Sequence, residues 1–184
     1  NMNIKSFYRL APKRVQGLGM PNPGISMLSH KLQLLRNEWD QATATGRMLR
    51  QSYEIFQMEV GLSSNIFTED FSRLGNLASN GWWKHLWHLC WKYKVGFHMR
   101  RKWQIPLLRE NDRSFMDVIC QSDIFTKEHK VRINGVHKHK AIHSIADLTL
   151  CDGRSVSPSV WTRQVGNSSR VFSKEVPTKE DFKL

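Results

Sequence analysis

The stretch GWWKHLWHLCWKYK at residues 81–94 places lysines and histidines among tryptophans and contains no carboxylate. Lys84, His88 and Lys92 are spaced four residues apart, so on a helix they form a single row. A row of cations suits contact with the phosphates of a nucleic acid, and exposed indole rings can stack on unpaired bases. The stretch therefore predicts a nucleic-acid-binding surface on one helix.

The overall charge of the chain favours the same class of partner. The formal net charge of +12 favours a polyanion such as nucleic acid or an anionic membrane face, although an ordinary basic surface is the alternative. No apolar run has the length needed to span a bilayer, so we expect no membrane partner. The further predicted phosphate contacts are Lys94, Arg100, Arg101 and Lys102, with a second group at Lys130, Arg132, Lys138 and Lys140.

The tryptophans of the same stretch allow two interpretations. Trp82, Trp83, Trp87 and Trp91, together with the neighbouring leucines, cover a wide apolar arc of a helix, which is typical of a helix buried in a core. If this arc is instead left exposed, it would suit stacking on bases or docking on another domain or a second copy of the chain. The distinguishing observation is whether all four rings are buried within this chain.

The histidines do not have the spacing of a metal site. His85 and His88 are three residues apart, and His137, His139 and His143 follow later among lysines that would repel a cation. A zinc site needs three or four ligands that converge in tetrahedral geometry, and no compact ligand pattern is present. We therefore predict no metal and no cofactor, and we expect the histidines to contact phosphate or to lie on the surface.

Catalytic motifs are also missing from the sequence. There is no paired-aspartate polymerase motif, P-loop or GxSxG nucleophile motif, so we do not expect the chain to be an enzyme on its own. A magnesium-dependent nuclease that uses Asp112 or Asp117 is the weakest alternative. Cys90, Cys120 and Cys151 are widely spaced and odd in number, which favours a reducing intracellular compartment, nuclear or cytoplasmic, over a disulfide scaffold.

The apolar periodicity predicts a mainly α fold, an irregular helical bundle with one short extended segment and a loose C-terminal tail. Thr126 is a candidate N-cap and Gly61 a candidate helix stop, whereas Gly135 weakens the helix around it by about 1 kcal/mol relative to alanine. The expected helices cover residues 25–39, 46–60, 82–93, a segment that starts near Asn111, and parts of 126–140, with an extended segment at 95–106.

The predicted domain organisation is simple. Residues 1–24 form an irregular basic segment rich in glycine and proline, residues 25–153 form the helical domain, and residues 154–184 form a Ser-rich tail. The inward stripe of the first helix is expected at Ile25, Leu28, Leu32, Leu35 and Trp39. That of the second is expected at Met48, Leu49, Ser52, Ile55, Phe56 and Glu59.

Several segments of residues 17–156 occur in the order of a known family. The segments are GLGMPNP, ATATGRMLRQSYEIFQMEVGL, ASNGWWKHLWHLCWKYKV, LLRENDRSFMDVI and IHSIADLTLCDGRSV. In this order the chain resembles the region downstream of the reverse transcriptase domain in open reading frames of non-long-terminal-repeat retrotransposons and related elements. The family tends to have a more regular basic helix before its ADLT segment, whereas this chain has Gly135 there.

The resemblance implies an accessory or connecting region of a reverse transcriptase polyprotein and not an active polymerase. Its implied partners are template RNA or target DNA and an adjacent polymerase domain. The first functional hypothesis is thus a basic helical accessory domain that binds nucleic acid through phosphate contacts. The second is a structural connector that docks through the tryptophan-rich helix. The sequence leaves the oligomeric state open.

Overall fold

The computed structural model describes residues 10, 12–15, 19–99 and 107–162, which form a mainly α-helical fold and confirm the predicted fold class. Within these residues the β-type pairings are two isolated bridges, Ser114 with Ser144 and Thr149 with Val156. The helices, with 3₁₀ turns named η, are η1 Lys13–Val15, α2 Pro23–Glu38, α3 Ala44–Val60, η2 Ile66–Thr68, α4 Phe71–Leu74, η3 Gly75–Leu77, α5 Trp82–Tyr93, α6 Phe115–Gln121, α7 Lys127–Lys140, α8 Ile145–Leu148 and α9 Ser159–Thr162.

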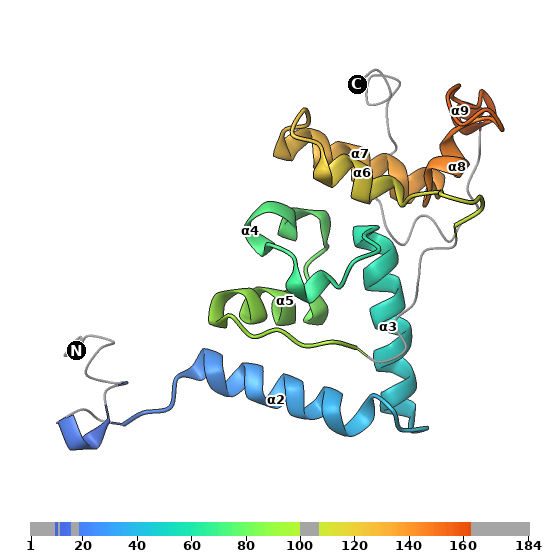
Figure 1. The fold of residues 1–184 in the computed structure, drawn as a ribbon. Helices are drawn as coiled ribbons and strands as arrows, with labels where there is room; N and C mark the ends of the chain where they lie inside the picture. Colours follow the sequence, from blue (N-terminus) through green and yellow to red (C-terminus); the bar gives the residue numbers. More distant parts are fainter. Residues whose placement is uncertain (1–9, 11, 16–18, 100–106, 163–184) are drawn as a thin grey trace.

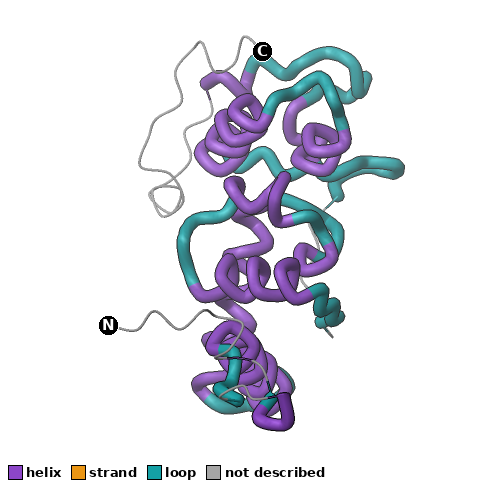
Figure 2. The backbone as a smooth tube through the Cα atoms, turned by 90° about the vertical axis from the view of Figure 1, so that its left-hand side faces the viewer, coloured by secondary structure: helices purple, strands orange, loops and turns teal. Residues whose placement is uncertain are grey.

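The helices stack in three tiers along the length of α3 (Figure 1). The first tier is α2, which contacts both α3 and α5. The second tier holds α5 with the short helices η2 and α4, and the third holds α6 and α7. Figure 2 shows the same order of tiers from the side. The tryptophan-rich helix α5 therefore lies in the middle of the molecule, with packing partners on both sides.

Polar caps and a glycine define the helix ends that the sequence predicts. The side chain of Thr126 accepts a hydrogen bond from the amide of His129 at 3.3 Å and caps α7. Gly61 ends α3 in the left-handed conformation, with a φ of 74°. Both predicted ends are confirmed. Helix α7 continues through Gly135, so residues 127–140 form one helix where the sequence predicts a partial one.

The buried face of α3 differs from the stripe that the sequence predicts. Met48 and Ile55 belong to that stripe, yet they are 69% and 47% exposed. Tyr53, which the stripe omits, is buried and stacks on Phe67 with ring centroids 6.0 Å apart. It also lies 5.1 Å from the ring of Trp83 on α5. The Tyr53 side of α3 faces inward because it packs against aromatic rings of η2 and α5. The spacing of residues within α3 cannot predict these contacts with other helices.

The centre of the core is aromatic. Besides its neighbour Trp82, the ring of Trp83 has four aromatic rings from other segments with centroids within 6.4 Å: Trp39 at the end of α2, Tyr53 and Phe56 of α3, and Phe67 of η2. Edge and tilted pairs of this kind each contribute about 0.5–1.5 kcal/mol beyond the burial of their area. Helix α5 is thus held in place by its own tryptophans, and this fixes which of its residues face outward.

The end of α3 is hydrogen-bonded to the third tier through Ser114. The segment before α6 pairs with the segment before α8, since the amide of Phe115 donates to the carbonyl of His143 at 3.0 Å and that of Ile145 donates to Arg113 at 2.9 Å. The hydroxyl of Ser114, between them, donates to the carbonyl of Gly61 at 2.7 Å. The end of α3 is therefore bonded directly to the bridge that positions α6 and α8.

Residues 109–116 are hydrogen-bonded to residues 146–153. The guanidinium of Arg109 donates to the carbonyl oxygens of Leu150 and Thr149 at 2.7 and 3.0 Å. The carboxylate of Asp112 accepts from the amides of Ala146 and Leu108, both at 3.1 Å. The polar residues of these segments thus serve the internal structure of the third tier.

The structure describes only parts of the predicted N-terminal segment and of the predicted C-terminal tail. Residues 154–162 belong to the predicted tail, and within them Val160 is 1% exposed and packs in the core. The rest of that tail, residues 163–184, lies outside the described residues, as do residues 1–9 and 100–106. Residues 95–99 of the predicted extended segment form neither helix nor strand and run between α2 and α5 (Figure 1).

Candidate nucleic-acid interface

Two of the four tryptophans of α5 are core residues. Trp83 and Trp87 are 6% and 0% exposed, and both indole N–H groups have partners within the chain. The Nε1 of Trp83 donates to the hydroxyl of Ser52 at 2.9 Å, and that of Trp87 donates to the carbonyl of Glu69 at 3.0 Å. Neither ring can stack on a base or dock on a partner, which removes two of the predicted docking or stacking residues.

The other two tryptophans of α5 are half-buried, and their surroundings differ. Trp82 has the ammonium of Lys31 at 4.2 Å from its ring centroid, and the same ammonium donates to the carbonyl of Trp82 at 3.5 Å. Trp91 lies at the other end of α5, where its ring has His88 at 6.2 Å and Phe71 at 6.2 Å. Because α2 covers the ring of Trp82, only Trp91 remains as a stacking candidate.

The predicted basic row lies on the side of α5 away from the aromatic core. Lys92 is exposed, and Lys94 follows it in the left-handed conformation, with its ammonium 5.3 Å from the ring of Trp91. His88 is half-buried beside Trp91. Lys84 is also half-buried and donates to the carbonyl of Ala78 at 2.8 Å. Lys84, His88 and Lys92 thus follow one side of α5, and the exposed cations, Lys92 and Lys94, lie at the C-terminal end of the helix.

Residues that the sequence analysis missed join this surface from two other elements. Phe71, the first residue of α4, lies with its ring 4.9 Å from that of His88. Lys127, the first residue of α7, donates to the carbonyl of Ser72 at 3.1 Å and brings a further cation to the start of α4. Both contacts join residues far apart in the chain, so no local pattern could have indicated them.

The second group of predicted phosphate contacts is divided by the structure. Lys130 is 9% exposed and donates to the carbonyl of Cys120 at 3.1 Å, inside the contact between α6 and α7. Lys138 forms an ion pair with Glu59 at 3.7 Å, and burial lowers its pKa. These two lysines serve internal contacts and are withdrawn from the predicted set. Arg132 is exposed and Lys140 half-buried, while Arg100, Arg101 and Lys102 lie outside the described residues.

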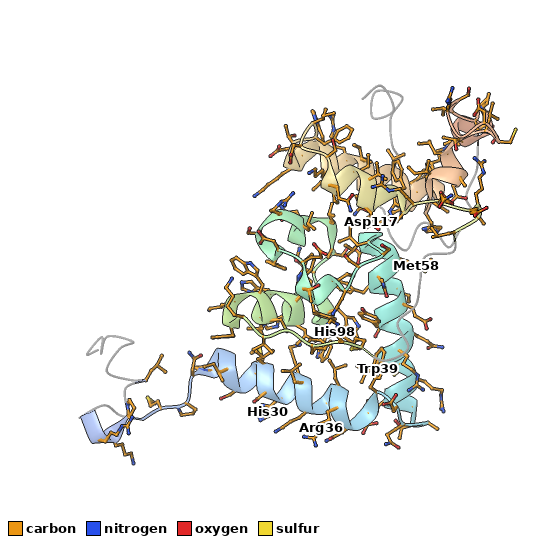
Figure 3. The ribbon with its side chains drawn as sticks, viewed as in Figure 1. His30, Arg36, Trp39, Met58, His98 and Asp117 are labelled. Atoms are coloured by element: carbon orange, nitrogen blue, oxygen red, sulfur yellow. The ribbon has the colours of Figure 1, made fainter. Side chains whose placement is uncertain are left out.

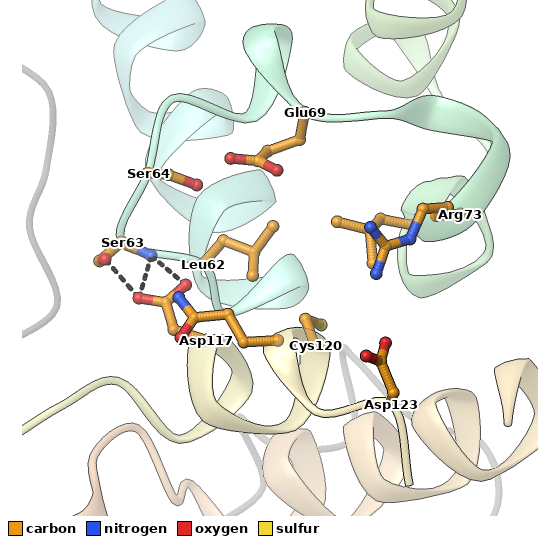
Figure 4. Close-up of a pocket in the computed structure, with 10 residues that line it drawn as sticks. Leu62, Ser63, Ser64, Glu69, Arg73, Asp117, Cys120 and Asp123 are labelled. Atoms are coloured by element: carbon orange, nitrogen blue, oxygen red, sulfur yellow. Dashed lines mark hydrogen bonds between the residues drawn. The ribbon is translucent and has the colours of Figure 1, made fainter. Parts of the chain in front are cut away.

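A polar hollow separates the second tier from α6 (Figure 4). Asp117 lines it and accepts hydrogen bonds from the amide and hydroxyl of Ser63. Arg73 and Asp123 reach into it from two sides. Within the described part of the chain, no three histidine, cysteine or acidic side chains are grouped so that they could hold a metal ion. Asp112 and Asp117, the residues of the nuclease alternative, both bond to backbone amides.

A second hollow, more apolar, lies between α2 and residues 95–99. Trp39 and Arg36 border it from α2 and His98 from the opposite segment (Figure 3). The amide of Asn65 holds this segment by donating to the carbonyl of Phe97 at 2.7 Å. The hollow has a single cationic side chain that could contact phosphate, Arg36, and an acid beside it, Asp40. It is therefore not a part of the basic surface.

Two of the three cysteines and one of the later histidines are buried in the core. Burial raises the pKa of Cys90 and of Cys120 to about 11, whereas Cys151 is exposed in the turn after α8. His137 is buried, and its ring lies 5.4 Å from that of His143. The expectation that the histidines lie at the surface or contact phosphate is wrong for His137.

Comparison with known proteins returns no relative. No protein-family model, curated protein or solved structure matches this chain. Among the described helices, none has both the length and the apolar content to cross a membrane.

Proposed function

We propose that this chain is a basic helical accessory domain of a reverse transcriptase-like retroelement polyprotein, which binds template RNA or target DNA through phosphate contacts. Its place of action would then be the nucleus or cytoplasm, next to a polymerase domain. The retroelement context is supported by the order of the resembling segments over residues 17–156. The nucleic-acid contact is supported by the surface of α5.

The observation that carries the proposal is the division of α5 into two faces. Trp83 and Trp87 anchor one face in the core, and this leaves Lys92 and Lys94 exposed. The ammonium of Lys94 lies 5.3 Å from the half-buried ring of Trp91, and that of Lys92 lies 5.5 Å from the ring of Tyr93. Lys127 adds a cation from α7 at the adjacent α4. Clustered cations beside an aromatic ring are suited to a strand that presents phosphates and bases together.

The connector alternative loses support from the same observation. Docking through the tryptophan face needs a large apolar patch that is left exposed. Two of the four rings are in the core, and Lys31 covers the ring of Trp82. The apolar area that remains around Trp91 lies among charged side chains, which favours an anionic strand over an apolar partner.

The test is a titration of fluorescent single-stranded RNA and duplex DNA over several salt concentrations, with the wild type and a Lys92→Gln, Lys94→Asn double variant. Asparagine suits position 94 because it tolerates the left-handed conformation. If both lysines contact phosphate, the slope of log K against log salt should become shallower by about 1.4 on single strands and about 1.8 on duplex.

The matched control removes the same charge elsewhere. An Arg36→Gln, Arg154→Gln double variant takes two exposed cations from α2 and from the turn after α8, neither of which belongs to the basic row of α5. It should keep the wild-type slope apart from a small change due to net charge. Equal losses in both double variants would mean that the net charge and not the α5 surface binds nucleic acid. Binding that does not depend on salt would refute the proposal.

A further inference from the structure

The ring of Trp91 is held from one side and borders a hollow on another. His88 stacks near it at an interplanar angle of 24°, and Phe71 lies at 38° to it. Phe71 is itself fixed by an edge contact with the buried ring of Trp87, at 5.2 Å. The Trp91 ring is thus oriented before any ligand binds, which lowers the entropy that a stacking partner would have to overcome.

The hollow beside Trp91 combines apolar and charged lining residues. We call it the Trp91 hollow; it lies between η2 and the end of α5, and its lining includes Phe67, Glu69, Asp70, Trp91, Lys94 and Val95. The charged residues of its lining are one cation, Lys94, and two acids, Glu69 and Asp70. Hydrogen bonds from Ser72 lower the pKa of Asp70, so its carboxylate is ionised at neutral pH.

These charges decide which part of a nucleotide could enter. The ionised carboxylate of Asp70 would repel a phosphate inside the hollow, whereas an uncharged base can lie against the ring of Trp91. The phosphates on either side of that base would meet Lys92 and Lys94 on the outer surface of α5. A base inside a duplex is stacked on its neighbours and does not offer its face to a side chain.

We propose that the Trp91 hollow takes an unpaired base, so that the α5 surface selects single-stranded over double-stranded nucleic acid. This inference rests on the proposed function, because it names the substrate class of the same surface. The chemistry of the ligand is a strand with accessible bases, RNA or DNA. Stacking of this kind does not depend on base identity, since every base has a π face.

The test compares three fluorescent probes of equal length: a single strand without self-complementarity, the same strand with abasic sites at its centre, and its blunt duplex. The abasic strand keeps every phosphate and lacks the central bases. We expect wild-type protein to bind the intact strand about 5- to 150-fold more tightly than the abasic strand, which is the effect of one stacked base. This comparison uses only the wild-type chain, so it does not depend on the folding of a variant.

The variants then assign the effect to one ring. Trp91→Ala should bind the intact and abasic strands equally, while Trp82→Ala, which removes the tryptophan covered by Lys31, should keep the wild-type difference. Circular dichroism of both variants establishes that the helices are intact.

The outcomes separate the two proposals. If no probe binds, the proposed function fails and the inference fails with it. If all three probes bind with the same salt-sensitive affinity, the proposed function stands and the Trp91 hollow is not a base site. A difference between intact and abasic strands that persists in Trp91→Ala would also overturn the inference, because the base would then stack elsewhere.

Discussion

His137 is a titratable residue enclosed by three elements of the fold. It is 1% exposed, and its ring lies beside Gly61 at the end of α3, where a Cβ would be 2.8 Å from the ring and 2.7 Å from Met116 of α6. Its Nδ1 is 3.1 Å from the side-chain oxygen of Asn134. Burial, followed by the nearby charges of His143 and Lys138, lowers the pKa of His137 to about 3.

This pKa shift predicts a loss of stability in acid. The folded state holds the pKa of His137 at about 3, below its ordinary value of 6.5, so the unfolded chain binds the proton more readily. The contribution of this residue is complete above pH 6.5 and falls as the pH drops towards 3, by up to about 1.4 kcal/mol per pH unit. Urea denaturation at pH 7.5, 6.5, 5.5 and 4.5 measures the decline.

The matched variants for this prediction are His137→Gln and His30→Gln. His30 is exposed on α2, so its replacement should leave the pH dependence of the unfolding free energy unchanged. His137→Gln should flatten that dependence between pH 6.5 and 4.5. An equally steep decline in His137→Gln would assign the acid sensitivity to other titratable groups.

The lysines show what a residue type can and cannot predict. Lys92 and Lys130 look alike in the sequence, since both lie on basic helices. Lys130 is buried because α6 places the carbonyl of Cys120 3.1 Å from its ammonium, whereas Lys92 is exposed, with its ammonium 5.5 Å from the ring of Tyr93. A lysine can extend its aliphatic stem through an apolar contact and bond at the far end. Which lysine does so depends on the neighbouring element.

At the scale of elements, the approach of α7 to α3 depends on a glycine. Gly61 has a φ of 74°, and a Cβ at this position would lie 2.7 Å from the Cγ of Met116 and 2.8 Å from the Cε1 of His137. The same residue that ends α3 therefore also allows α6 and α7 to pack against it. Gly135 is in a different situation, because no other described atom lies within 4 Å of its Cβ position.

Alanine at these two glycines should have opposite effects on stability. Gly61→Ala should lower the free energy of unfolding by more than about 1–2 kcal/mol, because the left-handed conformation is strained and the new methyl group clashes. Gly135→Ala should raise it by about 0.5–1 kcal/mol, since alanine favours the helix interior and meets no neighbour. Chemical denaturation of both variants gives the signs, and a stabilised Gly61→Ala would mean that α6 and α7 do not approach α3 as described.

The helices show how far sequence patterns predict this fold. The span 82–93 agrees with α5, and the cap at Thr126 and the stop at Gly61 are confirmed, because these signals are local. The predicted inward face of α3 is wrong at Met48 and Ile55, because contacts with aromatic rings of other helices determine which side of α3 is buried. The candidate site follows the same rule: its row of cations is local, whereas the contact of Phe71 with His88 is not.

At the scale of the whole molecule, Glu59 joins the tiers. It is a residue of α3, and its carboxylate accepts from the amide of Ser79 at 2.7 Å and from the hydroxyl of the same residue. The ammonium of Lys138 on α7 lies 3.7 Å from the same carboxylate oxygen. One buried acid thus connects α3, the segment that leads into α5 and the third tier.

Replacement of this acid should weaken the whole fold. Glu59→Ala leaves the amide of Ser79 and the ammonium of Lys138 without their acceptor, which should lower the free energy of unfolding by about 1–3 kcal/mol. Glu54→Ala, on the exposed side of the same helix, should change it by less than about 0.5 kcal/mol. Urea titrations monitored by circular dichroism compare the two. Equal stabilities would show that the tiers are held by apolar packing alone.

The different burial of the three cysteines has a practical consequence for observing this molecule. The thiolate is the reactive form, and the raised pKa values of Cys90 and Cys120 keep these buried groups protonated at neutral pH. Cys151 is exposed in the turn after α8. A maleimide dye should therefore attach at this one position in the native chain without any engineered change. Energy transfer from that dye to a labelled oligonucleotide would then report the direction in which a bound strand runs.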